Sequence, residues 1–472
     1  MGRKAMLSRV WATALGLVAL GLVALGCGDD SAPLDAGGDA GVDASASDGA
    51  VPDGGDAGEV DAGPPTPELR LRLQTPSADP IAGPAVVSGA RVWLRDAAGE
   101  LRVATSDEAG LARFALTAAD WPIELTMVAE GFVPVSFVGF EEEDLGYFAE
   151  RGLVQEEAPG EAPFRELQLL LERLPRVWLS GAQVGAEGDV LVVESTAGGE
   201  PFSGAPGPWS LRVQPRESAR VVGWVWSERE VAEPRSLAWD VDVASLELST
   251  ERDASELELD FRGEPEAVTR SFGFRVPADA PFHDAATPVG ALLLGNESDG
   301  PGMTIGFPTR TRWDAETRTV SVETWGPSGA GFASTGAWMA AQLVGEAGSS
   351  TVVQRLLGEG EVFDAAFLVP PALDEATADG IAWGEPVRWE PDGVERIESV
   401  VYLGGPAPWI VQAWGAAQGA AAPPALPEAL VDELLGEAPL QALVSTCDLV
   451  RWGLGSGGCE RQTQSAPFPV SR

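Results

Sequence analysis

The chain has 472 residues, of which 72 are acidic and 31 are basic, so its formal net charge at pH 7 is −41. Because a charge of this sign repels phosphate backbones and anionic lipid surfaces, the composition argues against a nucleic-acid-binding protein. The single histidine, His283, excludes a metal site built from several histidines of one chain. We therefore expect neither a metal ion nor a cofactor.

Residues 1–26 have the pattern of a secretory signal peptide. Positive charges at Arg3, Lys4 and Arg9 precede an uncharged and mostly apolar run at 10–25. This run is shorter than the roughly 20 residues that cross a bilayer as a helix. The pattern therefore favours a cleaved signal over a permanent membrane span.

Cys27 stands at the end of this apolar run, directly after Ala24, Leu25 and Gly26. These four residues resemble the lipobox of bacterial lipoprotein signals. In that family the chain is cut before the cysteine and acyl chains are attached to it, so the resemblance implies a lipid anchor at Cys27 in the bacterial cell envelope. We expect the outer membrane rather than the inner, with the protein periplasmic or surface-exposed. An ordinary cleaved signal with an incidental cysteine is the alternative.

The segment 27–67 repeats Asp-Ala-Gly and close variants. From Gly28 to Pro67 it has ten carboxylates, no basic residue and no aromatic residue. Such a segment cannot bury enough apolar surface to offset its ordering entropy, and its like charges repel one another. We predict a disordered acidic linker that spans roughly 35 Å. Calcium binding by the repeated Asp is the alternative, but the spacing fits neither an EF-hand nor a glycine-rich calcium repeat.

From residue 68 onward the pattern changes to apolar residues that alternate with a period of two. Ile123, Leu125 and Met127 share one face in this way, which is typical of a half-buried antiparallel strand. Asp at the first and Gly at the fourth position mark turns at 96–99 and 107–110. Turn signals every 8 to 12 residues or so predict an all-β fold of tandem antiparallel β-sandwich domains.

Residues 68 to about 140 resemble the carboxypeptidase-regulatory-like, or transthyretin-like, β-sandwich domain. The matching positions are Gly89, Val92, Thr105, Asp107, Gly110, Phe114, Gly131 and Phe132. The resemblance implies a small binding or spacer sandwich, which we place at 68–175, without an active site. On physical grounds, Asp107 and Gly110 should close a turn, and Phe114 should fill the space between the sheets.

Strand-like runs continue to the C-terminus. We divide them into a β-sandwich at 176–262 and two further β domains, at 263–375 and 376–472. The run 165–174 fits either the last strand of the first domain or a short helix. A helix is predicted within 426–435, because a proline stands near its start, leucines recur every four residues and a glycine follows.

Cys447 and Cys459 flank a glycine-rich turn between two strand-like runs. In an oxidising envelope compartment a pair this close predicts a disulfide, whereas a metal site would lack further soft ligands. Gly453, Gly455 and Gly458 fit the spacing of a dinucleotide-binding loop. The surrounding pattern does not supply the parallel strand and helix that such a loop requires.

Sixteen Trp residues against two Tyr raise the question of sugar-stacking platforms. Trp224 and Trp226 stand two apart on one predicted strand, so both project to the same face, where they either stack on a glycan or fill the core. His283 lies in a loop beside an aspartate, and Ser328 and Ser334 lack the Gly-x-Ser-x-Gly pattern of a nucleophile elbow. None of these three residues indicates hydrolysis.

Together these patterns predict a lipid-anchored cell-envelope protein with a non-catalytic role in binding, adhesion or structural display. Its expected partners are the membrane, through the anchor, and other envelope proteins or glycans. Two alternatives stay open. One is a carbohydrate-binding surface protein that uses Trp platforms, and the other is an envelope hydrolase whose carboxylates the sequence does not identify.

Overall fold

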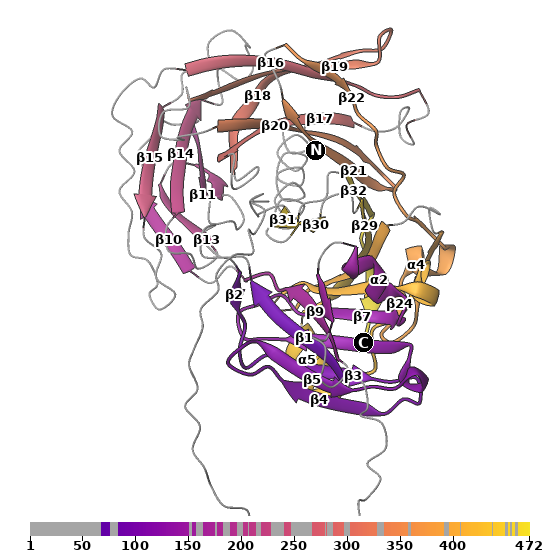
Figure 1. Ribbon diagram of the computed structural model, residues 1–472. Coiled ribbons are helices and arrows are strands. Elements are labelled where there is room, and N and C mark those ends of the chain that lie inside the picture. Colours follow the sequence, from indigo (N-terminus) through magenta and orange to yellow (C-terminus); the bar gives the residue numbers. More distant parts are fainter. Residues whose placement is uncertain are drawn as a thin grey trace, which may run out of the picture.

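The chain is all-β in the part that the structure describes, as the sequence predicts (Figure 1). Its helices there are short: α2 (Asp144–Ala149), α4 (Glu375–Asp379) and α5 (Glu428–Leu435). No helix of the described ranges is long and apolar enough to cross a bilayer. The computed structural model describes residues 68–75, 84–150, 153–156, 164–174, 177–182, 189–195, 202–205, 207–213, 219–227, 240–246, 267–278, 280, 287–296, 303–327, 335–356, 360–390, 396–405, 407–436, 438–448, 452–453, 456–457 and 461–472.

The first unit is a sandwich of two sheets. Its strands are β1 (Glu68–Thr75), β2 (Ala85–Val86), β3 (Arg91–Arg95), β4 (Leu101–Thr105), β5 (Leu111–Ala115), β6 (Ile123–Val128), β7 (Val135–Phe140), β8 (Val154–Glu156) and β9 (Phe164–Leu170). In one sheet β1 pairs with β2, β5 and β9, and β9 also pairs with β8. In the other, β3 pairs with β4 and β6, and β6 pairs with β7. The ambiguous run at 165–174 is thus a strand where β9 lies, and not a helix.

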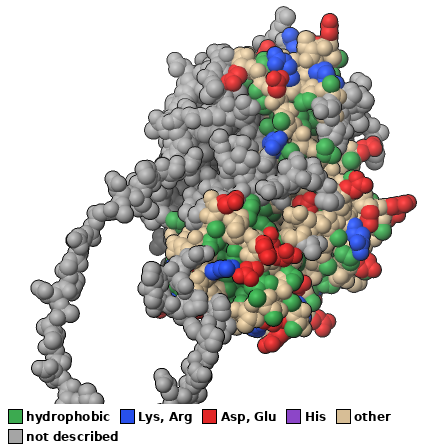
Figure 2. Space-filling view, turned by 45° about the vertical axis from the view of Figure 1, so that its right-hand side comes forward, with side chains coloured by type: hydrophobic (Ala, Val, Ile, Leu, Met, Phe, Trp, Pro, Cys, Tyr) green, Lys and Arg blue, Asp and Glu red, His purple; other side chains and the backbone are tan. Residues whose placement is uncertain are grey.

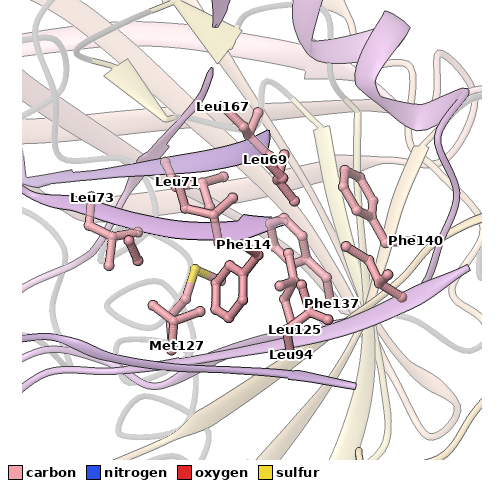
Figure 3. Close-up of a cluster of buried hydrophobic side chains, with 14 of the residues drawn as sticks. Leu69, Leu71, Leu73, Leu94, Phe114, Leu125, Met127, Phe137, Phe140 and Leu167 are labelled. Atoms are coloured by element: carbon pink, nitrogen blue, oxygen red, sulfur yellow. The ribbon is translucent and has the colours of Figure 1, made fainter. Parts of the chain in front are cut away.

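The core of this sandwich is built from both sheets. Figure 3 shows Leu71 of β1 on one side and Leu125 and Met127 of β6 on the other, with Phe114 of β5 between them. These side chains and Ile123 are buried. Fully burying one such side chain contributes about 1.5–3 kcal/mol. The predicted apolar face of β6 and the predicted place of Phe114 are confirmed.

The turn between β4 and β5 closes as predicted. The side chain of Asp107 accepts hydrogen bonds from the N–H groups of Ala109 at 2.9 Å and Leu111 at 3.0 Å. The N–H of Gly110 donates to the Asp107 carbonyl at 2.9 Å. Gly110 has a φ of +75°, and a Cβ there would lie 2.6 Å from the carbonyl oxygen of Leu73. The position therefore requires glycine both for its left-handed backbone and for its approach to β1.

The second unit forms two small antiparallel sheets. Its strands are β10 (Val177–Ala182), β11 (Asp189–Ser195), β12 (Phe202–Gly204), β13 (Pro208–Val213), β14 (Ala219–Ser227) and β15 (Asp240–Leu246). One sheet pairs β10 with β13, and the other has the order β12-β11-β14-β15. Leu191, Val193, Trp209 and Leu211 of these strands are buried.

The third unit consists of long strands. They are β16 (Ala267–Arg275), β17 (Thr287–Asn296), β18 (Met303–Asp314), β19 (Thr319–Pro327), β20 (Thr335–Gly345), β21 (Gly348–Leu356) and β22 (Val362–Asp364). Successive antiparallel pairs join β17 to β18, β18 to β19 and β20 to β21, while β17 also pairs with β20. β16 pairs with β19 and, in parallel, with β22.

The last unit holds the remaining short strands and the predicted helix. Its strands are β23 (Ala372–Leu373), β24 (Ile381–Ala382), β25 (Val387–Glu390), β26 (Arg396–Leu403), β27 (Trp409–Ala413), β28 (Ala420–Ala421), β29 (Leu440–Asp448), β30 (Trp452–Gly453), β31 (Ser456–Gly457), β32 (Arg461–Ser465) and β33 (Phe468–Ser471). Helix α5 begins after Pro427 and ends at Gly436, and it buries Leu430, Val431, Leu434 and Leu435 against this unit.

The first and last units share a sheet and two cores. β7 runs parallel to β27, which brings 135–138 opposite 410–413. Trp414 of the last unit lies in the core of the first, and Trp93 of the first lies in the core of the last. In Figure 1 the indigo and yellow strands accordingly lie together. β21 of the third unit pairs antiparallel with β32 of the last. Parallel pairs need long connections, so the local turn signals of the sequence do not predict them.

Candidate functional site

Several residues that the sequence singles out lie outside the described ranges. Their predicted roles therefore stay predictions. They are Cys27 with the linker 27–67, His283, Ser328, Ser334 and Cys459.

Trp224 and Trp226 lie on β14, an inner strand of its sheet. On the neighbouring β11 they stand opposite Val192 and Val190. That the two tryptophans share one face stays a prediction from the alternation of side chains along a strand. Their use as a glycan-stacking pair stays a prediction.

Cys447 lies near the end of β29, which pairs antiparallel with β32. Between these two strands β30 and β31 pair as a short hairpin, with Trp452 opposite Gly457. Gly453 thus belongs to an antiparallel hairpin and not to a loop between a strand and a helix, so the dinucleotide-binding pattern is fortuitous. The disulfide between Cys447 and Cys459 stays a prediction.

The contact between β7 and β27, which we call the seam, holds a buried polar network. The indole Nε1 of Trp409 donates to Oγ of Ser136 at 2.9 Å, and Oγ1 of Thr126 lies 2.9 Å from the same oxygen. All three residues are buried. Because an unpaired buried polar group costs about 1–3 kcal/mol, the network favours one register of β27 against β7.

Aromatic rings pack around the end of the seam. The ring of Trp414 lies 5.7 Å and 5.5 Å, between centroids, from Phe137 and Phe140 of β7. It lies 5.5 Å and 5.2 Å from Tyr147 and Phe148 of α2. Aromatic pairs contribute about 0.5–1.5 kcal/mol beyond the area that they bury. Trp414, which directly follows β27, therefore packs against both β7 and α2 through one side chain.

The backbones approach most closely at two glycines of the seam. Gly139 has a φ of +67°, and a Cβ there would lie 2.6 Å from the carbonyl oxygen of Trp414. Gly415, with a φ of +46°, would place a Cβ 2.9 Å from the carbonyl oxygen of Gly139. Each position therefore excludes a side chain unless the other segment shifts.

Charged side chains tie α5 and the loop before it to β3. Nη2 of Arg91 lies 3.0 Å from Oε1 of Glu433 on α5, and Arg95 donates to the carbonyl oxygen of Ala425. Burial raises the pKa of Glu124 above its usual range, although Arg95 lies 3.7 Å away and opposes the shift. Because ion pairs as exposed as Arg91 and Glu433 contribute little to stability, these contacts chiefly position the helix.

A second charged network braces the first unit. Nη2 of Arg102 lies 2.5 Å from Oδ2 of Asp96 and 2.7 Å from Oδ1 of Asp120. The hydrogen bond from Arg102 lowers the pKa of Asp96. The pKa of Asp120 is lowered chiefly by a hydrogen bond from the backbone N–H of Thr117, with a contribution from Arg102. Burial raises the pKa of Asp144. These shifts have structural causes and do not identify a nucleophile or a proton donor.

Acidic side chains are prominent on the face shown in Figure 2. Within the described ranges no group of three or more His, Cys, Asp or Glu side chains is placed to hold a metal ion. The best-defined arrangement in the described ranges is thus the seam. Its contacts hold β7 and β27 together and do not form a reactive site. Sequence analysis missed the seam, and its signals are a glycine inside a strand pattern, Gly139, and a small polar residue among large apolar ones, Ser136.

Comparison with known proteins does not assign the chain to a family. No protein-family model matches it. No curated protein matches it either. A solved structure that it resembles is SGBP-B of the mixed-linkage glucan utilization locus of Bacteroides ovatus, in complex with a mixed-linkage heptasaccharide. The identity is 14%, the TM-score is 0.13, and the match covers 62% of this chain and 64% of that chain. At this TM-score the likeness carries no argument about function.

Proposed function

We propose that the protein is a lipid-anchored component of the bacterial cell envelope that holds a rigid β body away from the membrane for binding or structural display, without catalysis. The resemblance of residues 24–27 to a lipobox, the acidic linker at 27–67 and the resemblance of 68–140 to a carboxypeptidase-regulatory-like domain support the proposal.

One structural observation carries this proposal. The strand β1 begins at Glu68, directly after the acidic linker, and it is paired on both of its edges. It lies antiparallel to β5 on one edge and parallel to β9 on the other. Leu69, Leu71 and Leu73 anchor it in the core. A tether attached at this point pulls on a strand that is hydrogen-bonded to a neighbouring strand on each edge and packed into the core through its apolar face. A display role requires such a firm attachment.

The anchor is tested with Cys27→Ser in the full chain. The variant should lose metabolic labelling by a fatty acid and should leave the membrane fraction, because a thiol is needed for acyl attachment. Ser31→Ala, four residues later, is the matched control and should stay labelled and membrane-bound. A Cys27→Ser protein that stays in the membrane fraction with its acyl label would disprove the proposal.

A second candidate function is binding of a carbohydrate through Trp224 and Trp226. The observation that favours it is their position two residues apart on β14, since alternate residues of a strand project to the same face. The double variant Trp224→Ala/Trp226→Ala should lose retention on an insoluble polysaccharide such as cellulose, with Trp313→Ala as the control. Equal retention of all three proteins would exclude this platform.

A further inference from the structure

The strand β4 lies at an edge of the first unit. It pairs antiparallel with β3, and no other strand of the described ranges pairs with it. Figure 1 shows it at the lower margin of the body. The N–H of Ser106 donates to the carbonyl of Ala90 at 2.9 Å, and the N–H of Asp96 donates to the carbonyl of Glu100 at 3.1 Å. Because hydrogen-bonded and non-bonded pairs alternate along such a ladder, the odd-numbered residues of β4 direct their backbone groups away from β3. They are Leu101, Val103 and Thr105.

The neighbouring edge strand, β5, differs in this respect, because other parts of the chain bond to its backbone. The carbonyl of Leu111 accepts from the N–H of Asp107 at 3.0 Å, and the carbonyl of Ala115 accepts from Nη1 of Arg102 at 2.6 Å. Within the described ranges no such contact reaches the outward backbone groups of β4. β4 is therefore the edge at which a further strand would find unpaired N–H and carbonyl groups.

The outward backbone of β4 is accompanied by an exposed apolar side chain. Val103 has an exposed fraction of 57%. It stands opposite Trp93 of β3, which lies in the core of the last unit, and Leu101 packs against the same core. Residues directly opposite one another on adjacent strands project to the same face. Val103 is thus the exposed end of an apolar strip that begins in that core.

Charge does not block this edge. Arg102 stands opposite Leu94 of the first core and so projects inward. An inward charge commonly protects an edge strand, because a new neighbour would bury it unpaired, but Arg102 is already bonded to Asp96 and Asp120. The three outward residues of β4 carry no charge. At physiological ionic strength the repulsion between two acidic chains is screened beyond about 8 Å.

We propose that β4 pairs antiparallel with β4 of a second copy of the chain. In this register Val103 stands opposite Val103 of the second copy, and Leu101 stands opposite Thr105 of that copy. The partner must be a short extended strand whose matching side chains are uncharged, and β4 itself meets this requirement. Antiparallel pairing of two identical strands is self-complementary, as a twofold interface requires.

This register uses the outward backbone groups of both strands and forms about six backbone hydrogen bonds. It also extends the apolar strip across four strands, from Trp93 of one copy to Trp93 of the other. The inference goes beyond the display role proposed above and does not depend on the lipid anchor.

The test is a disulfide across the twofold axis. The Cα atoms of a hydrogen-bonded antiparallel pair lie about 5.5 Å apart, which is within the range that a disulfide requires. Cells that produce the full-length chain with Val103→Cys are treated with diamide, a thiol oxidant that crosses membranes. A non-reducing gel should show a species of twice the chain mass, which a reductant removes. The wild-type chain gives the background from the native cysteines.

The matched control is Thr105→Cys, which changes an exposed residue on the same face of the same strand. In the proposed register the two copies of this residue lie about 14 Å apart, so the variant should give at least about tenfold less dimer. Leu101→Cys/Thr105→Cys should restore the dimer, because each cysteine then stands opposite the other in the second copy. This double variant replaces Val103→Cys if that variant does not fold.

Val103→Glu, added to the double variant, should abolish the crosslink, since it places two carboxylates directly opposite each other. The proposal is overturned if Val103→Cys gives no more dimer than Thr105→Cys, or if peptide mapping finds the crosslink to a different protein. The acyl label is measured separately. A membrane-bound chain that forms no dimer therefore refutes the pairing and leaves the display role intact, whereas a dimer without an acyl label refutes only the anchor.

Discussion

The indole N–H of Trp409 donates a 2.9 Å hydrogen bond to Oγ of Ser136, a residue 273 positions earlier in the chain. Trp409 belongs to the core of the last unit, and Ser136 belongs to a strand of the first. The bond therefore joins two parts of the chain that the sequence pattern divides into separate domains. It lies between buried side chains.

The variant Ser136→Ala tests this bond. It leaves Nε1 of Trp409 and Oγ1 of Thr126 buried without their shared partner, so the free energy of unfolding should fall by about 1–3 kcal/mol. Urea denaturation measures the loss. Ser88→Ala, at an exposed serine, should change the value by less than about 0.5 kcal/mol. Equal stabilities for the two variants would contradict the role assigned to the seam network.

The close approach of Gly139 and Gly415 predicts that a methyl group at Gly139 is not tolerated. Gly139→Ala combines a left-handed backbone, which costs an L-residue about 1–2 kcal/mol, with a clash against the Trp414 carbonyl, so the thermal midpoint should fall by several degrees. Gly146→Ala, in α2 with open space around its Cα, should be neutral or slightly stabilising. A midpoint for Gly139→Ala at or above that of the control would refute the model of the seam.

The network around Arg102 predicts a pH-dependent contribution to stability. The lowered pKa values of Asp96 and Asp120 mean that the folded protein binds these protons less tightly than the unfolded chain. The contribution is therefore complete above the ordinary value of about 3.9 and is lost as the pH falls through the lowered folded values. Arg102→Gln should destabilise the protein at pH 7, and the difference from wild type should shrink below about pH 4.

Urea denaturation across this pH range supplies the measurement. Arg91→Gln, which removes an ion pair with the exposed Glu433, should give a small difference from wild type throughout. A deficit of Arg102→Gln that stays constant from pH 7 to pH 3 would show that the guanidinium acts through packing and not through the two carboxylates.

The predicted disulfide between Cys447 and Cys459 should stabilise the hairpin that joins β29 to β32. In the chain-entropy model, closing a loop of this size contributes about 3 kcal/mol. Cys459→Ser should lower stability by that amount, and Cys447→Ser/Cys459→Ser should cost about the same as the single variant. Peptide mapping without reductant should recover the two cysteines in one linked fragment, and recovery as separate peptides would exclude the bond.

The sharing of cores predicts that the first unit is unstable by itself. A fragment of residues 68–175 lacks Ile397 and Trp414, which complete its core. It should give a broad, non-cooperative thermal transition and bind a hydrophobic dye, whereas the chain from residue 68 to its end should unfold cooperatively. A sharp transition of the isolated fragment would show that the seam is dispensable for its fold.

Local features of the fold could be predicted from the sequence because they depend on near neighbours. The alternation of apolar residues predicts the buried face of β6. The turn residues Asp107 and Gly110 predict the turn, and the proline and glycine at its ends predict the helix before Gly436. The seam could not be predicted in this way. Gly139 and Ser136 are unusual within the β7 pattern, but nothing local indicates that β7 finds its partner in β27.

If the chain is exported as proposed above, the seam also constrains when it can fold. The core of the first unit contains Trp414, so the part of the chain that leaves the secretion channel first cannot finish folding until nearly all of the sequence has followed it. Protease resistance of the N-terminal strands should therefore appear late, together with that of the C-terminal strands. On that proposal, the unfinished apolar core of the first unit would meanwhile stay exposed, which makes the precursor prone to aggregate before its C-terminal strands arrive.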